Sequence, residues 1–222
     1  MCGRFTYAKE FRDIRLRFTS ERDLPLFRPR YNIAPTQEVS VIINDDGGWN
    51  IRMMKWGLVP SWAKDPSIGN RMINARCETI AEKASFKRLI GRQRCLVPAD
   101  SFYEWRKEGK RKLPMRILLK TREPFTFAGL WDLWKKPEGG ELLSFTIITT
   151  EANELLRPIH DRMPVILQRD GEDKWLDPGF TDPARLLPIL RPYPSDLMEA
   201  YAISTLVNSP ANDRPECIEE VQ

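Results

Sequence analysis

Short apolar runs dominate the chain, and they predict a fold built mainly from β-strands. Several runs alternate apolar and polar positions, which is the period of a strand with one buried face. The turn-forming segment 44–48 separates two runs, and Glu108-Gly109-Lys110 forms a hairpin turn between two more. The predicted strands cover residues 2–5, 38–43, 49–56, 94–97, 101–106, 113–119, 125–130, 142–149, 165–167 and 202–204.

Helical spacing is confined to short segments. Phe11, Ile14 and Phe18 recur at helical spacing and predict an amphipathic helix over residues 8–18. Thr150 is a good N-cap for a short helix that ends before residue 160. The other predicted helices cover residues 78–89, the surroundings of 172–175, and the surroundings of 184–187.

Two proline-bearing segments, residues 25–35 and 57–74, are predicted to be loops. The strands outnumber the helices and do not alternate regularly with them, so the fold class is α+β, with a mostly antiparallel, barrel-like β core and short flanking helices. No composition break marks a boundary, and residues 1–222 are expected to form a single domain.

The composition is that of a soluble globular protein, with 41% hydrophobic and 30% charged residues among 222. No apolar stretch approaches the length of a membrane helix, so no membrane association is expected. The first residues, Met1-Cys2-Gly3-Arg4-Phe5, lack the apolar region of a secretory signal. We therefore expect a cytoplasmic protein, or a nuclear one in a eukaryote.

Cysteine and histidine are too sparse for several kinds of site. The four cysteines are scattered, no CxxC pair occurs, and the chain has one histidine, His160. This pattern argues against a disulfide framework and against a structural metal site, and we expect no metal and no cofactor. A mechanism that needs two histidines is also excluded.

Charge is distributed unevenly along the chain. Residues 1–122 carry 26 Lys and Arg against 13 Asp and Glu, whereas residues 123–222 carry 9 against 18. A first half with a net charge of +13 suggests a surface for a polyanion such as nucleic acid. The alternative is that the two halves attract each other within one fold.

Cys2 is the most informative residue of the sequence. Removal of Met1 by an aminopeptidase would leave a residue with both an α-amine and a thiol, which both titrate close to neutral pH. Such a 1,2-aminothiol condenses with an aldehyde to a thiazolidine ring, or its thiol attacks an acyl carbon with the amine as base. The nearby Arg4 could lower both pKa values or bind a phosphate. An incidental cysteine at position 2 is the alternative.

Three further polar groups are candidates for chemistry. Asn74 could hold a reacting oxygen and Arg76 a phosphate, although a helix cap and a surface charge are the more common roles. Glu104 lies between aromatic residues, which raise the pKa of a carboxyl as a general acid requires, unless it points to solvent from an edge strand. His160 titrates near neutral pH and is a credible proton carrier, or else a capping residue.

Seven segments together resemble the SOS-response-associated peptidase (SRAP) family, in family order from residue 2 to about 168, with a weaker similarity at Val207-Asn208. No departure occurs at the reactive positions. The segments are Met1-Cys2-Gly3-Arg4-Phe5, Tyr31-Asn32-Ile33-Ala34-Pro35, Trp56-Gly57-Leu58-Val59-Pro60-Ser61-Trp62, Ile73-Asn74-Ala75-Arg76-Cys77-Glu78-Thr79, Cys95-Leu96-Val97-Pro98-Ala99, Phe102-Tyr103-Glu104-Trp105 and Ile159-His160-Asp161-Arg162-Met163-Pro164.

The resemblance implies a protein that binds single-stranded DNA and captures abasic sites through a thiazolidine formed by the mature N-terminal Cys2. It implies that Asn74 orients the sugar, that Glu104 acts as acid and base, and that His160 moves protons. It further implies a DNA-damage and SOS-response role, with a monomer associated with the nucleoid. The implied DNA-binding residues are Arg4, Asn32, Pro35, Trp62, Arg76 and Arg162.

Two other classes of function stay open at this point. An N-terminal-nucleophile thiol hydrolase, of the glutamine amidotransferase or peptidase kind, would use Cys2 with His160 and Asn74 for acyl transfer. A plain nucleic-acid-binding module would leave Cys2 inert and would lose nothing on Cys2→Ser.

Overall fold

Two β-sheets share one hydrophobic core in this computed structural model, which describes residues 2–9, 28–45 and 48–221. The strands are β1 (Phe5–Tyr7), β2 (Arg30–Ile33), β3 (Glu38–Asp45), β4 (Gly48–Trp56), β5 (Asn74–Arg76), β6 (Arg94–Ala99), β7 (Ser101–Glu108), β8 (Arg111–Leu119), β9 (Phe125–Lys135), β10 (Glu141–Glu151), β11 (Arg162–Pro164), β12 (Ile166–Leu167) and β13 (Met198–Ala202). The described α-helices are α2 (Arg169–Leu176) and α3 (Pro183–Leu186).

Short helical turns of the 3-10 type connect several strands. They are η1 (Pro66–Arg71), η2 (Cys77–Thr79), η3 (Leu187–Ile189), η4 (Ser195–Leu197), η5 (Thr205–Asn208) and η6 (Pro215–Ile218). None of the described helices is long and apolar enough to cross a membrane.

Five strands close on themselves. Strand β4 pairs with β3, β3 with β6, β6 with β9 and β9 with β10, all antiparallel, and β10 returns to β4 in parallel. This ring confirms the predicted α+β class with a mostly antiparallel, barrel-like core. The short strand β5 runs parallel beside β10.

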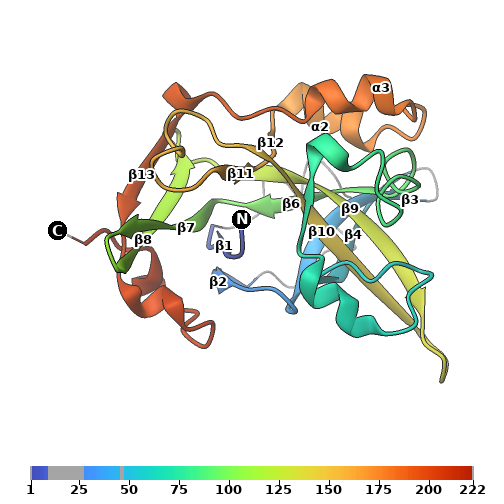
Figure 1. Ribbon diagram of the computed structural model, residues 1–222, viewed down its shortest axis with the longest axis horizontal. Coiled ribbons are helices and arrows are strands. Elements are labelled where there is room, and N and C mark those ends of the chain that lie inside the picture. Colours follow the sequence, from blue (N-terminus) through green and yellow to red (C-terminus); the bar gives the residue numbers. More distant parts are fainter. Residues whose placement is uncertain (1, 10–27, 46–47, 222) are drawn as a thin grey trace.

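The second sheet has the order β13-β8-β7-β1-β2, so that the first strand of the chain is an interior strand. Figure 1 shows the N-terminal end near the middle of the molecule, with the barrel on one side and the β7–β8 hairpin on the other. The two sheets therefore meet at the residues that precede β1.

Phe5 fixes β1 to the barrel. Its ring packs edge-on against Trp56 of β4 and Phe127 of β9, with centroids 5.2 and 5.8 Å away. Aromatic pairs of this kind add about 1 kcal/mol beyond burial alone. The indole nitrogen of Trp56 also donates to the carbonyl of Ile73 at 2.9 Å. One buried aromatic residue thus holds both the strand after Cys2 and the residue before Asn74.

Two predicted helices are wrong. Residues 78–89 form η2 followed by single turns, which bury Ile80, Phe86 and Leu89 against the barrel without a continuous helix. Thr150 caps no helix, because β10 continues through it and pairs it with Met163 of β11. The side chain of Asn153 instead caps the following turn, since its oxygen accepts from the amide of Leu156 at 3.1 Å.

Other boundaries differ in part. The predicted loop 25–35 contains strand β2, which pairs antiparallel with β1. Strand β1 itself begins at Phe5 rather than at Cys2, and the last strand β13 ends where the sequence predicted it to begin. The predicted helix 8–18 lies almost wholly outside the described residues.

Candidate functional site

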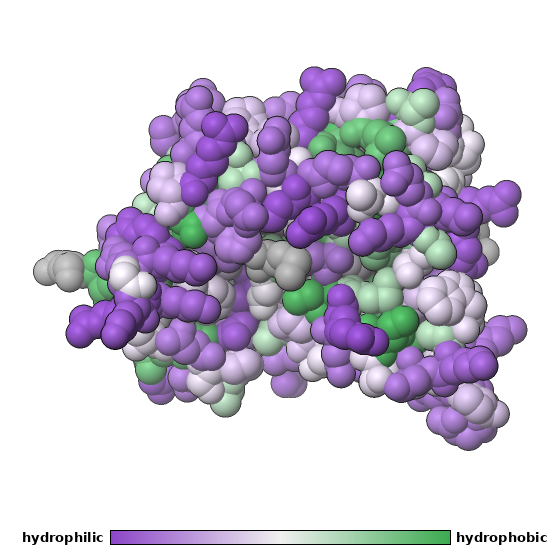
Figure 2. Space-filling model, viewed as in Figure 1, coloured by the Kyte–Doolittle hydropathy of each residue, from purple (hydrophilic) through white to green (hydrophobic). Residues whose placement is uncertain are grey.

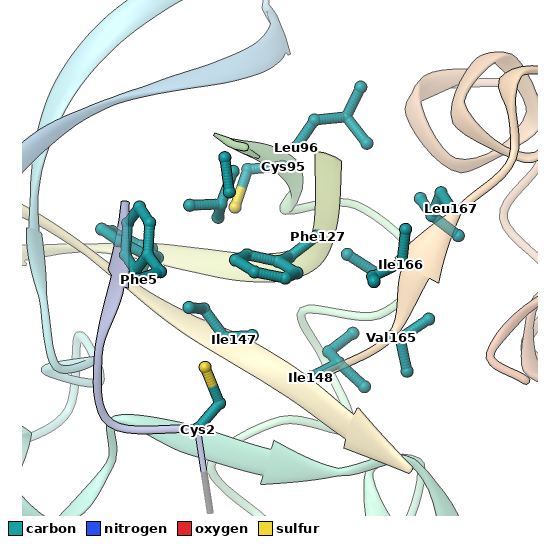
Figure 3. Close-up of a cluster of buried hydrophobic side chains, with 14 of the residues drawn as sticks. Cys2, Phe5, Cys95, Leu96, Phe127, Ile147, Ile148, Val165, Ile166 and Leu167 are labelled. Atoms are coloured by element: carbon teal, nitrogen blue, oxygen red, sulfur yellow. The ribbon is translucent and has the colours of Figure 1, made fainter. Parts of the chain in front are cut away.

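Cys2 lies at the junction of the two sheets and is fully buried. Figure 3 shows its side chain within the hydrophobic cluster, with the sulfur directed toward Ile147 of β10. Burial raises the pKa of the thiol far above its ordinary value, and the negative charge of Glu104 raises it further. The thiol is therefore held neutral and close to the carboxyl of Glu104.

Glu104 lies on β7, in a pocket of about 470 Å³ that it shares with His160. The side chain of Glu104 is 3% exposed, and burial raises its pKa, while the charge of His160 acts in the opposite direction. The sequence pattern alone slightly favoured a glutamate that points to solvent from an edge strand, and the burial of Glu104 shows that this interpretation was wrong. A raised pKa suits a carboxyl to general acid catalysis.

His160 has two states available to its Nδ1 atom. This nitrogen accepts from the amide of Arg162 at 3.0 Å and lies 2.8 Å from a carboxylate oxygen of Asp161. The first contact requires Nδ1 without a proton, and the second becomes an ion pair when Nδ1 is protonated. The ring is thus supported both before and after it takes up a proton.

Asn74 begins β5 and stands in register with Ile147, the residue toward which the Cys2 sulfur points. Both polar atoms of its side chain are buried, and neither has a hydrogen-bond partner in the described structure. A buried amide without partners costs about 1–3 kcal/mol, so this amide does not stabilise the fold and is available to a ligand. Asn74 lies in strand β5 and caps no helix, so the alternative interpretation as a helix cap is wrong.

Arg76 and Trp62 are exposed, as a contact with DNA requires. Arg76 ends β5, and 54% of the Trp62 side chain is accessible. Arg162 is different, because its guanidinium forms a fork with Glu78, at 2.6 and 2.9 Å, and also donates to the carbonyl of Thr149 at 2.8 Å. Arg162 can bind a phosphate only in competition with these partners.

Arg4 and Asn32 are committed to the protein itself. One nitrogen of Arg4 donates to the oxygen of Asn32 at 2.7 Å and to the carbonyl of Val207 at 2.6 Å. The fully buried amide of Asn32 donates in turn to the carbonyls of Val207, Ser209 and Asn212. Because the side chain of Asn32 is inaccessible and its amide is fully engaged, a direct DNA contact at Asn32 would require these bonds to break, and it stays a prediction.

Pro35 is half-buried, just before Thr36, whose backbone has a positive φ of 76°. A DNA contact at Pro35 stays a prediction.

Four residues of the pocket were not among those singled out for binding. Trp105, Lys107, Lys112 and Asn208 line it together with Glu104 and His160. The two lysines could have been found from the basic hairpin that follows Glu104. For Asn208, which comes from a helical turn about 100 residues further along the chain, the only signal was the weaker family similarity at Val207-Asn208.

No described cluster of three or more His, Cys, Asp and Glu side chains could hold a metal ion. All four cysteines are free in the structure.

Comparisons with known proteins identify the family. The model of the family "SOS response associated peptidase (SRAP)" matches residues 1–210. Abasic site processing protein YoqW of Bacillus subtilis (strain 168) is 52% identical over 222 residues, which cover 99% of each chain. Abasic site processing protein HMCES of Pongo abelii is 35% identical, covering 100% of this chain and 76% of that protein. A crystal structure of a protein from Bacteroides thetaiotaomicron matches with a TM-score of 0.79 and 32% identity, over 86% of this chain and 85% of that one. The family match spans nearly the whole chain, and this protein therefore belongs to the SOS response associated peptidase (SRAP) family.

Proposed function

We propose that this protein binds single-stranded DNA and captures abasic sites covalently through Cys2, after removal of Met1. The observation that carries the proposal is the buried Cys2 thiol close to Glu104, which shares a pocket with His160, while the partnerless amide of Asn74 stands in register with Ile147 beside the Cys2 sulfur. The names of the relatives YoqW and HMCES, both abasic site processing proteins, support the choice of DNA lesion.

The chemistry needs only the aldehyde of the ring-opened abasic sugar. The α-amine of Cys2 adds to the aldehyde carbon, and loss of one water gives an iminium ion. The thiol sulfur then adds to the same carbon while its proton leaves, which closes a neutral thiazolidine ring. The net reaction forms one C–N and one C–S bond and releases one water, so no oxidant or cofactor is required.

Electrostatics favours this order of steps. Before reaction, burial raises the pKa of both Cys2 and Glu104, and the charge of Glu104 further disfavours the Cys2 thiolate. An iminium cation formed on the Cys2 nitrogen would lower the pKa of both groups. The thiol proton can then pass to a carboxylate that has already given its own proton to the departing water.

The other residues of the site have roles that follow from their positions. His160, supported at Nδ1 in both charge states, exchanges protons with solvent at the pocket. The amide of Asn74 binds the hydroxyl or aldehyde oxygen of the sugar. Exposed Arg76 and Trp62 bind a phosphate and stack on a base of the flanking strand.

The burial of Cys2 weighs against an acyl-transfer hydrolase as the principal activity. Such an enzyme needs a thiolate, or a thiol with its base at hand, facing the substrate. Here the sulfur points into an apolar cluster and its pKa is raised. An aldehyde reaction that begins at the amine does not need a free thiolate in its first step.

The deciding experiment uses untagged protein and a single-stranded oligonucleotide with one abasic site, analysed on a denaturing gel and by intact mass. The expected product is protein lacking Met1 plus DNA minus one water. Cys2→Ala should abolish it, and an uncleaved N-terminal tag should do the same because it blocks the α-amine. Cys2→Ser should give an adduct only after reduction, since it forms the imine but cannot close the sulfur ring.

Cys77→Ala is the matched control, because Cys77 is only half-buried and would be the more accessible thiol. It should crosslink as well as the parent protein. Capture by tagged protein, or loss of capture in Cys77→Ala alone, would show that the α-amine of Cys2 is not the reactive group.

A further inference from the structure

The pocket beside Glu104 has a second wall that is basic and polar. Its residues are Trp105, Lys107 and Lys112 of the β7–β8 hairpin and Asn208 of η5. In the sequence of the hairpin tip, residues 106–112, five basic residues accompany one acidic residue. Figure 2 shows strongly hydrophilic side chains gathered at the end of the molecule where this hairpin lies in Figure 1.

The pocket reaches both faces of β7 because one edge of this strand becomes free. Strand β1 pairs with β7 only at Ser101 and Phe102, so no described strand covers that edge from Glu104 onward. Side chains of opposite orientation, such as Glu104 and Lys107, can therefore line one space. The basic wall is thus continuous with the reactive site.

Lys107 and Lys112 stand directly opposite each other in the hairpin register. Like charges in this position repel and weaken the hairpin unless an anion lies between them. The acidic residue of the tip, Glu108, is bound by Arg106 at 2.6 and 3.0 Å. Within the described residues, neither lysine forms an ion pair, so the pair is available to an external anion.

Asn208 adds directed donors to the same wall. The indole nitrogen of Trp105 donates to the side-chain oxygen of Asn208 at 2.8 Å, which leaves the amide nitrogen for the pocket. The segment that carries Asn208 is held firmly, because the carbonyls of Val207 and Ser209 both accept from the buried amide of Asn32. The donor is therefore fixed in place before any ligand arrives.

We propose that Lys107, Lys112 and the amide of Asn208 form a subsite for a backbone phosphate of single-stranded DNA next to the captured sugar. That the neighbouring sugar is an abasic one rests on the proposed function, whereas the anion site itself rests only on these three residues. Two ammonium groups and a fixed amide match the several acceptor oxygens of one phosphate. A pocket of about 470 Å³ falls within the range that holds a small ligand such as a sugar phosphate.

The test uses an oligonucleotide in which tetrahydrofuran replaces the abasic sugar, so that binding is measured without any covalent step. The double variant Lys107→Gln/Lys112→Gln should bind it about tenfold more weakly near 0.15 M salt, and its log–log salt slope should be smaller by about 0.7, the value for one phosphate of a single strand. Asn208→Asp should weaken binding in the same direction, because it replaces the donors with a negative charge.

Lys110→Gln is the control for position, because it removes one positive charge from the same hairpin outside the pocket lining. It should leave the salt slope unchanged. A neutral methylphosphonate next to the tetrahydrofuran should weaken binding by the parent protein but not by the double variant. Thermal unfolding verifies that each variant is folded.

The outcomes separate the two proposals. An unchanged affinity and slope in the double variant, or an equal loss in Lys110→Gln, would overturn the subsite even if abasic DNA is captured normally. Lysine-dependent binding without any covalent adduct on true abasic DNA would support the subsite and overturn the capture reaction.

Discussion

Asn32 tests whether a polar residue near the site serves the DNA or the fold. Its side chain is fully buried and makes four hydrogen bonds, one from Arg4 and three to carbonyls of the C-terminal segment. The three bonds to carbonyls join residues separated by 175 to 180 positions in the chain. We therefore expect Asn32→Ala to act mainly on stability.

The magnitude follows from the bonds that are lost. A buried hydrogen bond contributes about 1 kcal/mol net, and more when its partner is left without water. Val207 keeps its bond from Arg4, so its carbonyl is not orphaned, whereas the carbonyls of Ser209 and Asn212 lose this donor. The expected loss in the free energy of unfolding is about 3 kcal/mol.

Urea unfolding measures this loss, and hydrogen exchange over residues 203–221 shows whether the C-terminal segment opens first. Asn44→Ala is the matched control, since the Asn44 amide makes one bond, to the carbonyl of Leu176 at 3.1 Å, and should cost about 1 kcal/mol. Folded Asn32→Ala should keep the salt slope of DNA binding. A stability loss below about 1 kcal/mol together with a smaller salt slope would refute this structural role and favour Asn32 as a DNA contact.

Three further predictions concern the site and its support. Gly69→Ala should lower the free energy of unfolding by about 2 kcal/mol and slow capture, because a Cβ there would lie 2.6 Å from the carbonyl oxygen of Gly57. Gly48→Ala, whose Cβ would have nothing within 4 Å, should be tolerated, and urea unfolding compares the two variants. Glu104→Gln should be more stable than the parent near pH 8 but not near pH 3. The pKa of Glu104 is raised in the folded state, so the parent loses stability as the pH rises through that pKa, and the amide does not. Equal stabilities at pH 8 would contradict this. Glu78→Gln should free Arg162 from its fork and raise affinity for single-stranded DNA about threefold at low salt, measured by fluorescence anisotropy; a lower affinity would mean that the fork shapes the site.

The sequence predicted the strands of the barrel well, because these strands bury at least one face and carry long apolar runs. It missed β2, β5 and β11, which are only three or four residues long; β2 lies between Pro29 and Pro35, and β11 ends in Pro164, and proline favours a loop prediction. It also predicted a helix over 78–89, where spacing alone could not distinguish one helix from successive single turns packed on the barrel.

The reactive residues could be identified from their chemistry, but their partners could not. Cys2, Glu104 and His160 are exceptional as a 1,2-aminothiol, a carboxyl among aromatics and a lone histidine. Nothing in the sequence around Arg4 or Asn32 indicates that their side chains hydrogen-bond to carbonyls beyond residue 200, because those bonds depend on the tertiary fold. Asn208 is also far from the hairpin in sequence, and the family similarity at Val207-Asn208 does not indicate which pocket it lines.

The burial of Cys2 predicts the order in which the C–N and C–S bonds form. A thiol that is buried, neutral and directed toward Ile147 is a poor first nucleophile, whereas the Cys2 nitrogen becomes a nucleophilic α-amine once Met1 is removed. We therefore expect the imine to form first and the sulfur to add second. In that case Cys2→Ser, trapped by cyanoborohydride, should form its imine at nearly the rate at which the parent forms an intermediate trapped in the same way. If the parent intermediate appears much faster than the Cys2→Ser imine, sulfur attacks the aldehyde first. Removal of Met1 would then have to lower the pKa of the thiol.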